Sequence, residues 1–117
     1  MNIEEMIEKI DLDIEDAKRQ ISLRDSLNRL HENKDFQLVI MEGYIKEEAS
    51  RIALCLADAE FQDPEKQEQL NKMAYGIGGL FQYFRKLSMM AQMSESALQD
   101  HEQAKIEMLA EEGEVIQ

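Results

Sequence analysis

The sequence has few of the residues on which most catalytic and metal sites depend. It holds one cysteine, two histidines and no tryptophan in 117 residues. The lone Cys55 excludes a disulfide within one chain, and its place in an apolar run predicts a small buried hydrophobe rather than a nucleophile. A di-metal helical bundle needs two Glu-x-x-His pairs. Because Asn28 stands three residues before His31, and Leu98 three before His101, we expect no such centre and two solvated histidines.

No other catalytic or cofactor-binding signature is present. Gly76-Ile77-Gly78-Gly79 follows no predicted strand and is not followed by Lys-Ser or Lys-Thr, which excludes a dinucleotide fingerprint and a P-loop. The acidic run that begins at Asp58 lacks a calcium loop's key residues, since Asp63 replaces the glycine and Gln69 the bidentate glutamate. We therefore predict a protein without enzyme activity and without a cofactor or bound metal.

Basic residues are scarce. Asp and Glu number 25 against 13 Lys and Arg, for a net charge of −12. Acids outnumber bases by ten to six over residues 1–35, six to two over 36–63 and nine to five over 64–117. No segment is basic, so we expect no direct nucleic acid binding. The simplest interpretation of the acidity is a solvated outer face, and the alternative is a mimic of a nucleic acid duplex or a docking surface for a basic partner.

Long apolar runs are also lacking. No run approaches the ~20 residues that a membrane-spanning helix needs. The first residues, Met1-Asn2-Ile3-Glu4-Glu5, do not resemble the basic start of a secretion signal. We expect no membrane association, and a protein made in a reducing cytoplasm.

What the sequence does have is heptad spacing, most clearly in its second half. Apolar residues there step by three and four: Leu70, Met73, Ile77, Leu80, Phe84, Leu87 and Ala91. The spacing predicts a long helix over about 64–109, with Asp63 as N-cap and Pro64 at the first helical position. The glycines of Gly76–Gly79 weaken this helix. The sequence leaves open a continuous or mildly bent helix, a kink or break, and a face cleared for another backbone or an aromatic ring.

Two shorter helices are predicted before it. The first, over about 2–30, carries a second heptad series: Ile3, Ile7, Ile10, Ile14, Ala17 and Ile21. Its apolar series then slips to Leu23, Leu27 and Leu30, which indicates either a break at Ser22–Asp25 or an overwound continuous helix. The second, over about 34–57, has Asn33 as its candidate N-cap, and we expect Gly43 at a close helix crossing.

These elements predict an all-α protein: an elongated antiparallel three-helix bundle, up-down-up, with a long C-terminal helix and coiled-coil-like packing. We expect one domain over residues 1–110 and a flexible acidic tail over 111–117. The two shorter helices cannot cover the long one, so apolar surface is left for a partner. The predicted interface residues are Phe81, Tyr83, Phe84, Arg85, Leu87, Met89, Met90 and Met93.

Three segments carry a resemblance to a known class of proteins. They are Arg29–Phe36, Glu42–Arg51 and Ile77–Arg85, within a likeness that covers about residues 22–102. The chain resembles small acidic all-helical proteins encoded among the head and portal genes of tailed bacteriophages. The resemblance implies a component of the virion, assembled in the cytoplasm of the bacterial host, with no catalytic motif to carry across.

The functional hypothesis is therefore a non-enzymatic virion structural or assembly protein. Its partners would be further copies of itself, or the phage capsid, portal or connector. The alternative is an acidic phage-encoded binding module that inhibits a basic host protein or a nucleic-acid-binding protein. A small DNA-packaging subunit is disfavoured because it would need a basic element that contacts DNA.

Overall fold

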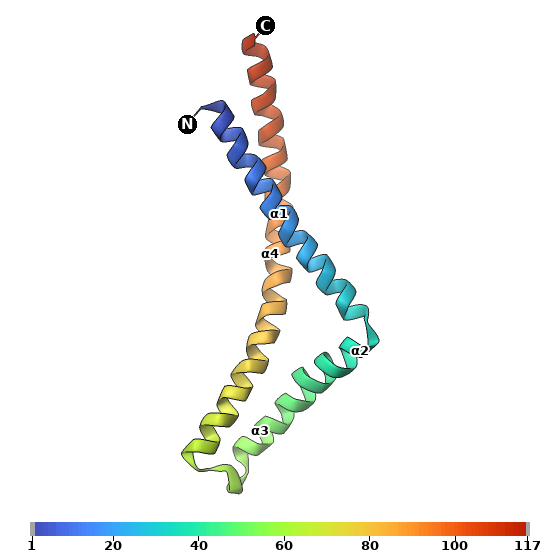
Figure 1. Cartoon of the computed structure of the whole chain (residues 1–117), viewed down its shortest axis with the longest axis vertical. Helices are drawn as coiled ribbons and strands as arrows, with labels where there is room; N and C mark the ends of the chain where they lie inside the picture. The colour runs from blue at the N-terminus through green and yellow to red at the C-terminus, as the bar shows by residue number, and fades with distance from the viewer. Residues whose placement is uncertain (1, 117) are drawn as a thin grey trace. The chain divides into compact units, whose positions relative to one another are not determined.

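The computed structural model describes residues 2–116, and nearly all of them are helical (Figure 1). No strand occurs among these residues, so the predicted all-α class is confirmed. The elements in chain order are α1 (Ile3–Glu32), α2 (Lys34–Phe36), the π-helix η1 (Gln37–Glu48), α3 (Ala49–Ala57), the 3₁₀ turn η2 (Ala59–Phe61) and α4 (Pro64–Ile116).

The chain divides into two compact units. The terminal unit joins the described residues up to Ser26 with those from Leu87 onward, and the hairpin unit is Leu27–Lys86. Both α1 and α4 contribute residues to each unit. The single domain expected over residues 1–110 stays a prediction.

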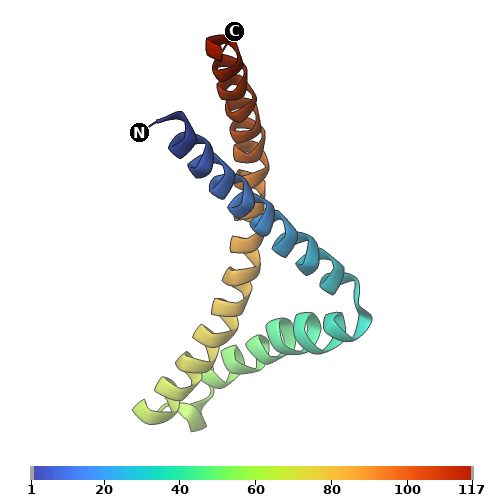
Figure 2. The same ribbon diagram turned by 45° about the horizontal axis from the view of Figure 1, so that its top comes forward.

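The long C-terminal helix begins where its capping residues predict. The Asp63 carboxylate accepts a hydrogen bond from the Lys66 amide at 3.4 Å, and Pro64 is the first helical residue. α4 is one uninterrupted helix of 53 residues, which passes through Gly76–Gly79 without a break (Figure 2). It continues past the predicted end at 109 as far as Ile116, while Gln117 lies outside the described residues. The flexibility expected over 111–117 stays a prediction.

The first helix is also continuous. α1 passes through Ser22–Asp25, so the break considered there does not form. The predicted slip of its apolar series is wrong in two of three residues, since Leu23 and Leu30 are exposed while Leu27 is buried. The original heptad count continues from Ile21 to Arg24, Asn28 and His31, and of these Arg24 and His31 are half-buried while Asn28 is exposed. The buried face of α1 therefore includes two polar residues that a pattern based on apolar residues does not reveal, together with Leu27.

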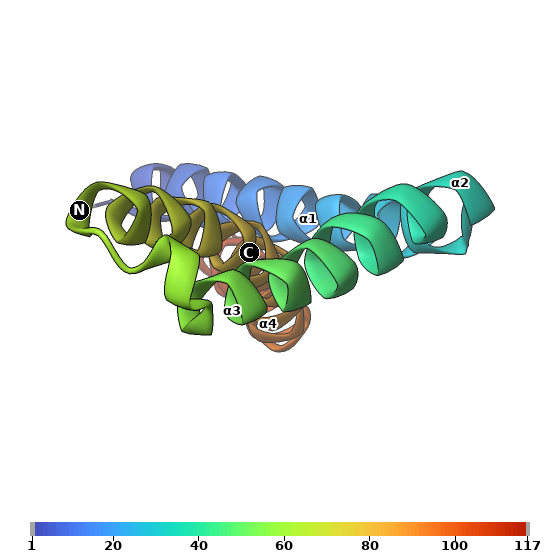
Figure 3. The same ribbon diagram turned by 90° about the horizontal axis from the view of Figure 1, so that it is seen from below.

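The predicted helix over 34–57 exists as a continuous run of three helical segments, α2, η1 and α3 (Figure 3). Asn33 caps it, since its side-chain oxygen accepts from the Phe36 amide at 3.0 Å. The run was expected to be α-helical, but its middle, Gln37–Glu48, is a π-helix of 12 residues. Gly43 lies in this π-helix, and a Cβ there would stand 3.2 Å from the carbonyl oxygen of Leu38, five residues earlier. The close approach at Gly43 is therefore within its own helix, and the predicted helix crossing is wrong.

The hairpin unit has a thin core. After α3 the chain turns through Asp58–Asp63, and Gln67 closes the turn by donating to the carbonyls of Leu56 and Phe61. Between the two helices of this hairpin, three side chains are buried together: Ile52, Leu70 and Ile77. A single layer of buried side chains is what two paired helices can provide, because each buries one stripe and exposes the rest.

Candidate functional site

An open apolar groove runs along one side of the hairpin unit. It encloses about 330 Å³ between η1 and α3 on one wall and α4 on the other. None of its lining residues is charged: Ile45, Ala49, Ile52, Ala53, Leu56, Ala74, Ile77, Gly78 and Phe81. We call this surface the hairpin groove, and it is the candidate functional site.

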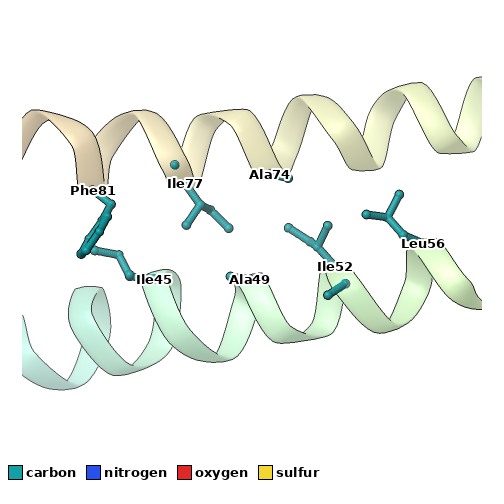
Figure 4. A pocket seen from close by; sticks show the side chains of 9 residues that line it. Ile45, Ala49, Ile52, Leu56, Ala74, Ile77 and Phe81 are labelled. Carbon is teal, nitrogen blue, oxygen red and sulfur yellow. The ribbon is translucent and has the colours of Figure 1, made fainter.

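The groove exists because small residues stand beside the buried core. Ile52 and Ile77 point into the space between the helices, and Phe81 lies next to Ile45 at one end (Figure 4). Between these larger side chains the walls are formed by Ala49, Ala53, Ala74 and Gly78. Small side chains let another helix approach closely, at an interaxial distance of about 8–10 Å.

The other side of the hairpin has a hollow of similar size, about 320 Å³, but its lining includes two charged residues: Tyr44, Glu48, Ile52, Lys72, Met73, Gly76 and Ile77. The Tyr44 hydroxyl lies 3.6 Å from where a Cβ on Gly76 would be, while Gly76 itself is exposed. This distance is an ordinary van der Waals contact that a methyl group would also allow, so the cleared face for an aromatic ring, one of the alternatives left open by the sequence, stays a prediction. Gly78 and Gly79 have no such neighbour within 4 Å.

Two of the predicted interface aromatics belong to a ring cluster in the hairpin unit. The Phe84 ring contacts His31 edge-on, with centroids 5.5 Å apart, and lies 6.0 Å from Phe36. Tyr83 stacks obliquely against Phe84 at 6.5 Å. His31 was expected to be solvated, and this is wrong, because its ring is held between Phe36 and Phe84. His101 is half-buried as well.

Three of the predicted residues of the hairpin unit are exposed on its surface: Phe81, Tyr83 and Arg85. Phe81 and Tyr83 are about half exposed, and Arg85 is exposed with no ion pair among the described residues. Phe81 is the one predicted residue that lines the hairpin groove. The opposite wall, from Ile45 to Leu56, contains none of the predicted interface residues.

The predicted residues of the terminal unit fall into two groups. Leu87 is buried, so its side chain is taken up by packing within the chain. Met89 and Met93 are exposed, and Met90 and Met93 line a shallow hollow together with Ser94 and Ala97. Exposed methionines make adaptable contacts because the thioether side chain is flexible and polarizable. Their role in an interface stays a prediction.

Charge is distributed unequally between the two units. The terminal unit contains fifteen acids and five bases, a net charge of −10, whereas the hairpin unit contains ten acids and eight bases, a net charge of −2. The excess of acidic residues is therefore concentrated in the terminal unit of the folded chain, although it is spread evenly along the sequence. Counts over consecutive stretches of sequence do not show this difference in net charge, because the terminal unit combines residues from both ends of the chain.

Ion pairs within each unit add local order. In the terminal unit Lys105 contacts Asp11 at 2.5 Å, and Arg24 binds both Asp25 and Glu95. The hydrogen bond from Arg24 to Glu95, followed by the one to Asp25, raises the pKa of Arg24. These contacts join α1 to α4 in antiparallel order, because the earlier residue of α1 meets the later residue of α4.

The hairpin unit contains an ion pair between Glu48 and Arg51. The Arg51 guanidinium donates to the Glu48 carboxylate, with one of the two contacts at 3.1 Å. This hydrogen bond lowers the pKa of Glu48 and raises that of Arg51. Besides Glu48, Arg51 contacts the sulfur of Cys55 on its own helix, at 3.8 Å. Cys55 is half-buried and packs against the core.

The described residues contain no group of three or more His, Cys, Asp or Glu side chains placed to hold a metal ion. Among the same residues, none of the helices combines the length and the apolar character that crossing a membrane requires.

Comparison with known proteins gives no relative for this chain: no protein-family model, curated protein or solved structure matches it.

Proposed function

We propose that this chain is a non-enzymatic structural or assembly protein of a tailed phage particle. It acts by self-association or by docking on the capsid, portal or connector through apolar helix faces. The hairpin groove is the observation that carries the proposal, because an uncharged groove of about 330 Å³ lies open beside a core of three buried residues. The phage resemblance of residues 22–102 supplies the particle as the setting.

The physical reason is the thinness of the core. A pair of helices buries one stripe on each and leaves the flanking apolar residues in water, so a second layer of helices stabilises it by removing apolar surface at about 25 cal/mol per Å². In the finer architecture that we propose, the chain runs up, down and up with coiled-coil-like packing, as its two heptad series favour. Further copies or a particle protein then add the missing layer.

The proposal includes no catalysis, no cofactor, no direct nucleic acid binding and no membrane association. The chain would be assembled in the cytoplasm of the bacterial host and retained in the virion. The net charge of −12 would keep the unassembled chain soluble and away from the phage DNA.

The protein composition of the phage particle tests this proposal. Purified virions and assembly intermediates of the encoding phage are analysed by mass spectrometry, after cross-linking through lysines such as Lys86 and Lys105. We expect peptides of this chain in a fixed ratio to the capsid or portal protein, and cross-links to that protein or to a second copy. Absence of the chain from both virions and intermediates would contradict the proposal.

One observation favours a second candidate. The terminal unit has a net charge of −10, which is the concentration of negative charge that an acidic inhibitor of a basic protein needs. On this hypothesis the chain binds a basic host protein or a nucleic-acid-binding protein. A pull-down that captures such a protein at low salt, and loses it as the salt concentration rises, would support this candidate over the particle protein.

A further inference from the structure

We propose that the hairpin groove is covered by the hairpin groove of a second copy, with the two hairpins antiparallel about a two-fold axis. This inference rests on the proposed function, since it specifies the self-association named there. Two hairpins packed face to face in this way make a four-helix bundle, in which each groove is filled by the other's helices.

The charges at the two ends of the hairpin favour a second copy. At the closed end, residues 58–68 carry five acids and one base, and at the open end residues 81–86 carry two bases and no acid. Arg85 lies on the same face of α4 as the groove, since it follows Phe81 by four residues and Gly78 by seven. An antiparallel pair brings the basic end of each copy to the acidic end of the other. A parallel pair would join ends of like charge.

The spacing of these charges fits one register. If the two-fold axis passes near Ala53 and Ala74, each α4 crosses its counterpart at Ala74. Arg85 and Asp63 both lie eleven residues from Ala74, so each Arg85 meets the other copy's Asp63. On the other wall, Lys46 of η1 lies toward the open end and Glu60 of η2 lies at the closed end, so the antiparallel order brings these opposite charges to the same end of the pair.

The centre of this arrangement is suited to close packing. Ala53 and Ala74 lie on facing walls of the groove, with Ala49 and Gly78 beside them. These short side chains bring the two α4 helices near enough for residues at the axis to touch their own counterparts. The near-neutral hairpin unit, with a net charge of −2, also adds little repulsion between copies, unlike the terminal unit with −10.

Disulfide trapping tests the register. In the full chain with Cys55→Ala, Ala74→Cys places one thiol at the proposed axis, and Tyr75→Cys places one on the neighbouring, 78 % exposed residue. A disulfide requires Cα atoms within about 7 Å. Under mild oxidation at micromolar concentration, we expect a covalent dimer from Ala74→Cys at a rate at least about tenfold above that of Tyr75→Cys, reversed by a thiol. The pair Ala53→Cys and Leu54→Cys repeats the comparison on α3.

Exchanging the charges at Lys46 and Glu60 tests the antiparallel orientation of the two copies independently of the cysteine variants. We expect Lys46→Glu, and separately Glu60→Lys, to raise the dimer dissociation constant by about tenfold, because the symmetric dimer loses two attractions each time. The double variant should restore it to near the wild-type value. The control is Lys72→Glu, on the other side of the hairpin, which should leave dimerisation unchanged. It is matched to Lys46→Glu because each variant loses one ion pair four residues apart, Lys72–Glu68 at 3.2 Å or Lys46–Glu42 at 3.5 Å.

The outcomes separate this inference from the proposed function. A chain that self-associates while Ala74→Cys forms disulfides no faster than Tyr75→Cys, or while the charge exchange restores nothing, overturns the antiparallel groove pairing and leaves the proposed function standing. A monomeric chain that still binds a particle protein overturns the pairing too and assigns the groove to that protein. A chain absent from particles but dimeric in this register contradicts the proposed function alone.

Discussion

The Tyr44 hydroxyl lies 3.6 Å from the position that a Cβ on Gly76 would occupy. This distance is an ordinary van der Waals contact, so the tyrosine does not require position 76 to lack a side chain completely. A methyl group at position 76 therefore fits beside Tyr44, whereas a longer side chain pointing the same way would have to displace the Tyr44 hydroxyl.

A graded substitution at Gly76 follows from this contact. Gly76→Ala should stabilise the chain by up to about 1 kcal/mol, because alanine has the higher helix propensity and meets no clash. Gly76→Leu should destabilise it, since the branched side chain must displace the Tyr44 ring. Urea denaturation followed by circular dichroism measures both. A Gly76→Leu variant as stable as Gly76→Ala would show that Tyr44 does not pack over this position.

Gly43 should respond differently from Gly79. A Cβ at Gly79 meets nothing within 4 Å, so Gly79→Ala should gain about 1 kcal/mol of helix propensity. A Cβ at Gly43 would stand 3.2 Å from the Leu38 carbonyl oxygen, and Gly43→Ala should gain less than Gly79→Ala or lose stability. The same denaturation experiment compares the two. Equal gains would mean that the π-helical geometry around Gly43 imposes no constraint.

The thin core predicts a strong dependence on Ile52. Its side chain is 1 % exposed and packs against Leu70 and Ile77, so Ile52→Ala should cost about 2–5 kcal/mol through lost burial and the cavity left behind. Leu54→Ala, two residues away with a side chain 75 % exposed, should change stability by less than about 0.5 kcal/mol. Thermal denaturation of both variants is the measurement. Comparable losses of stability in the Ile52→Ala and Leu54→Ala variants would show that the core is not centred on Ile52.

The Glu48–Arg51 pair predicts a pH dependence. Because the Arg51 hydrogen bond lowers the folded-state pKa of Glu48 below its ordinary 4.5, the pair's contribution is present above the unfolded pKa and is lost as pH falls through the folded pKa. We expect a carbon-detected NMR titration to give Glu48 a pKa below 4.5, and Arg51→Ala to raise it toward that value. A Glu48 pKa that is the same in both proteins would remove the pair as its cause.

Local signals in the sequence were sufficient for the helices and their beginnings. Asp63 and Asn33 each accept an amide hydrogen bond three residues ahead, as short polar side chains do at N-caps. The heptad series of α4 is also correct in its buried members, Leu70, Ile77, Leu87 and Ala91. These features depend on residues within one or two helical turns of each other, which is why a pattern along the chain reveals them.

Features that depend on distant residues were missed. Arg24 and His31 occupy partly buried positions of α1 because Glu95 and Phe84, more than fifty residues later, provide an ion pair and an aromatic contact. The π-helix over Gln37–Glu48 has no composition signal apart from Gly43. The charge contrast between the units was hidden because acids from the two ends of the chain are counted together only after folding.

The exposed apolar faces lead to the most general prediction, that this chain does not function alone. Phe81 in the hairpin groove and Met93 in the terminal unit both remain in water unless another protein covers them. Phe81→Asp should therefore weaken association strongly while leaving the helices intact, because a carboxylate would replace an aromatic ring at the groove's end.

Native mass spectrometry of the purified full chain, alone and mixed with the dissociated proteins of the particle, tests this most directly. We predict dimers or larger assemblies of the chain at micromolar concentration, or a complex with a capsid, portal or connector protein. A chain that stays monomeric at every concentration and binds none of those proteins would contradict it.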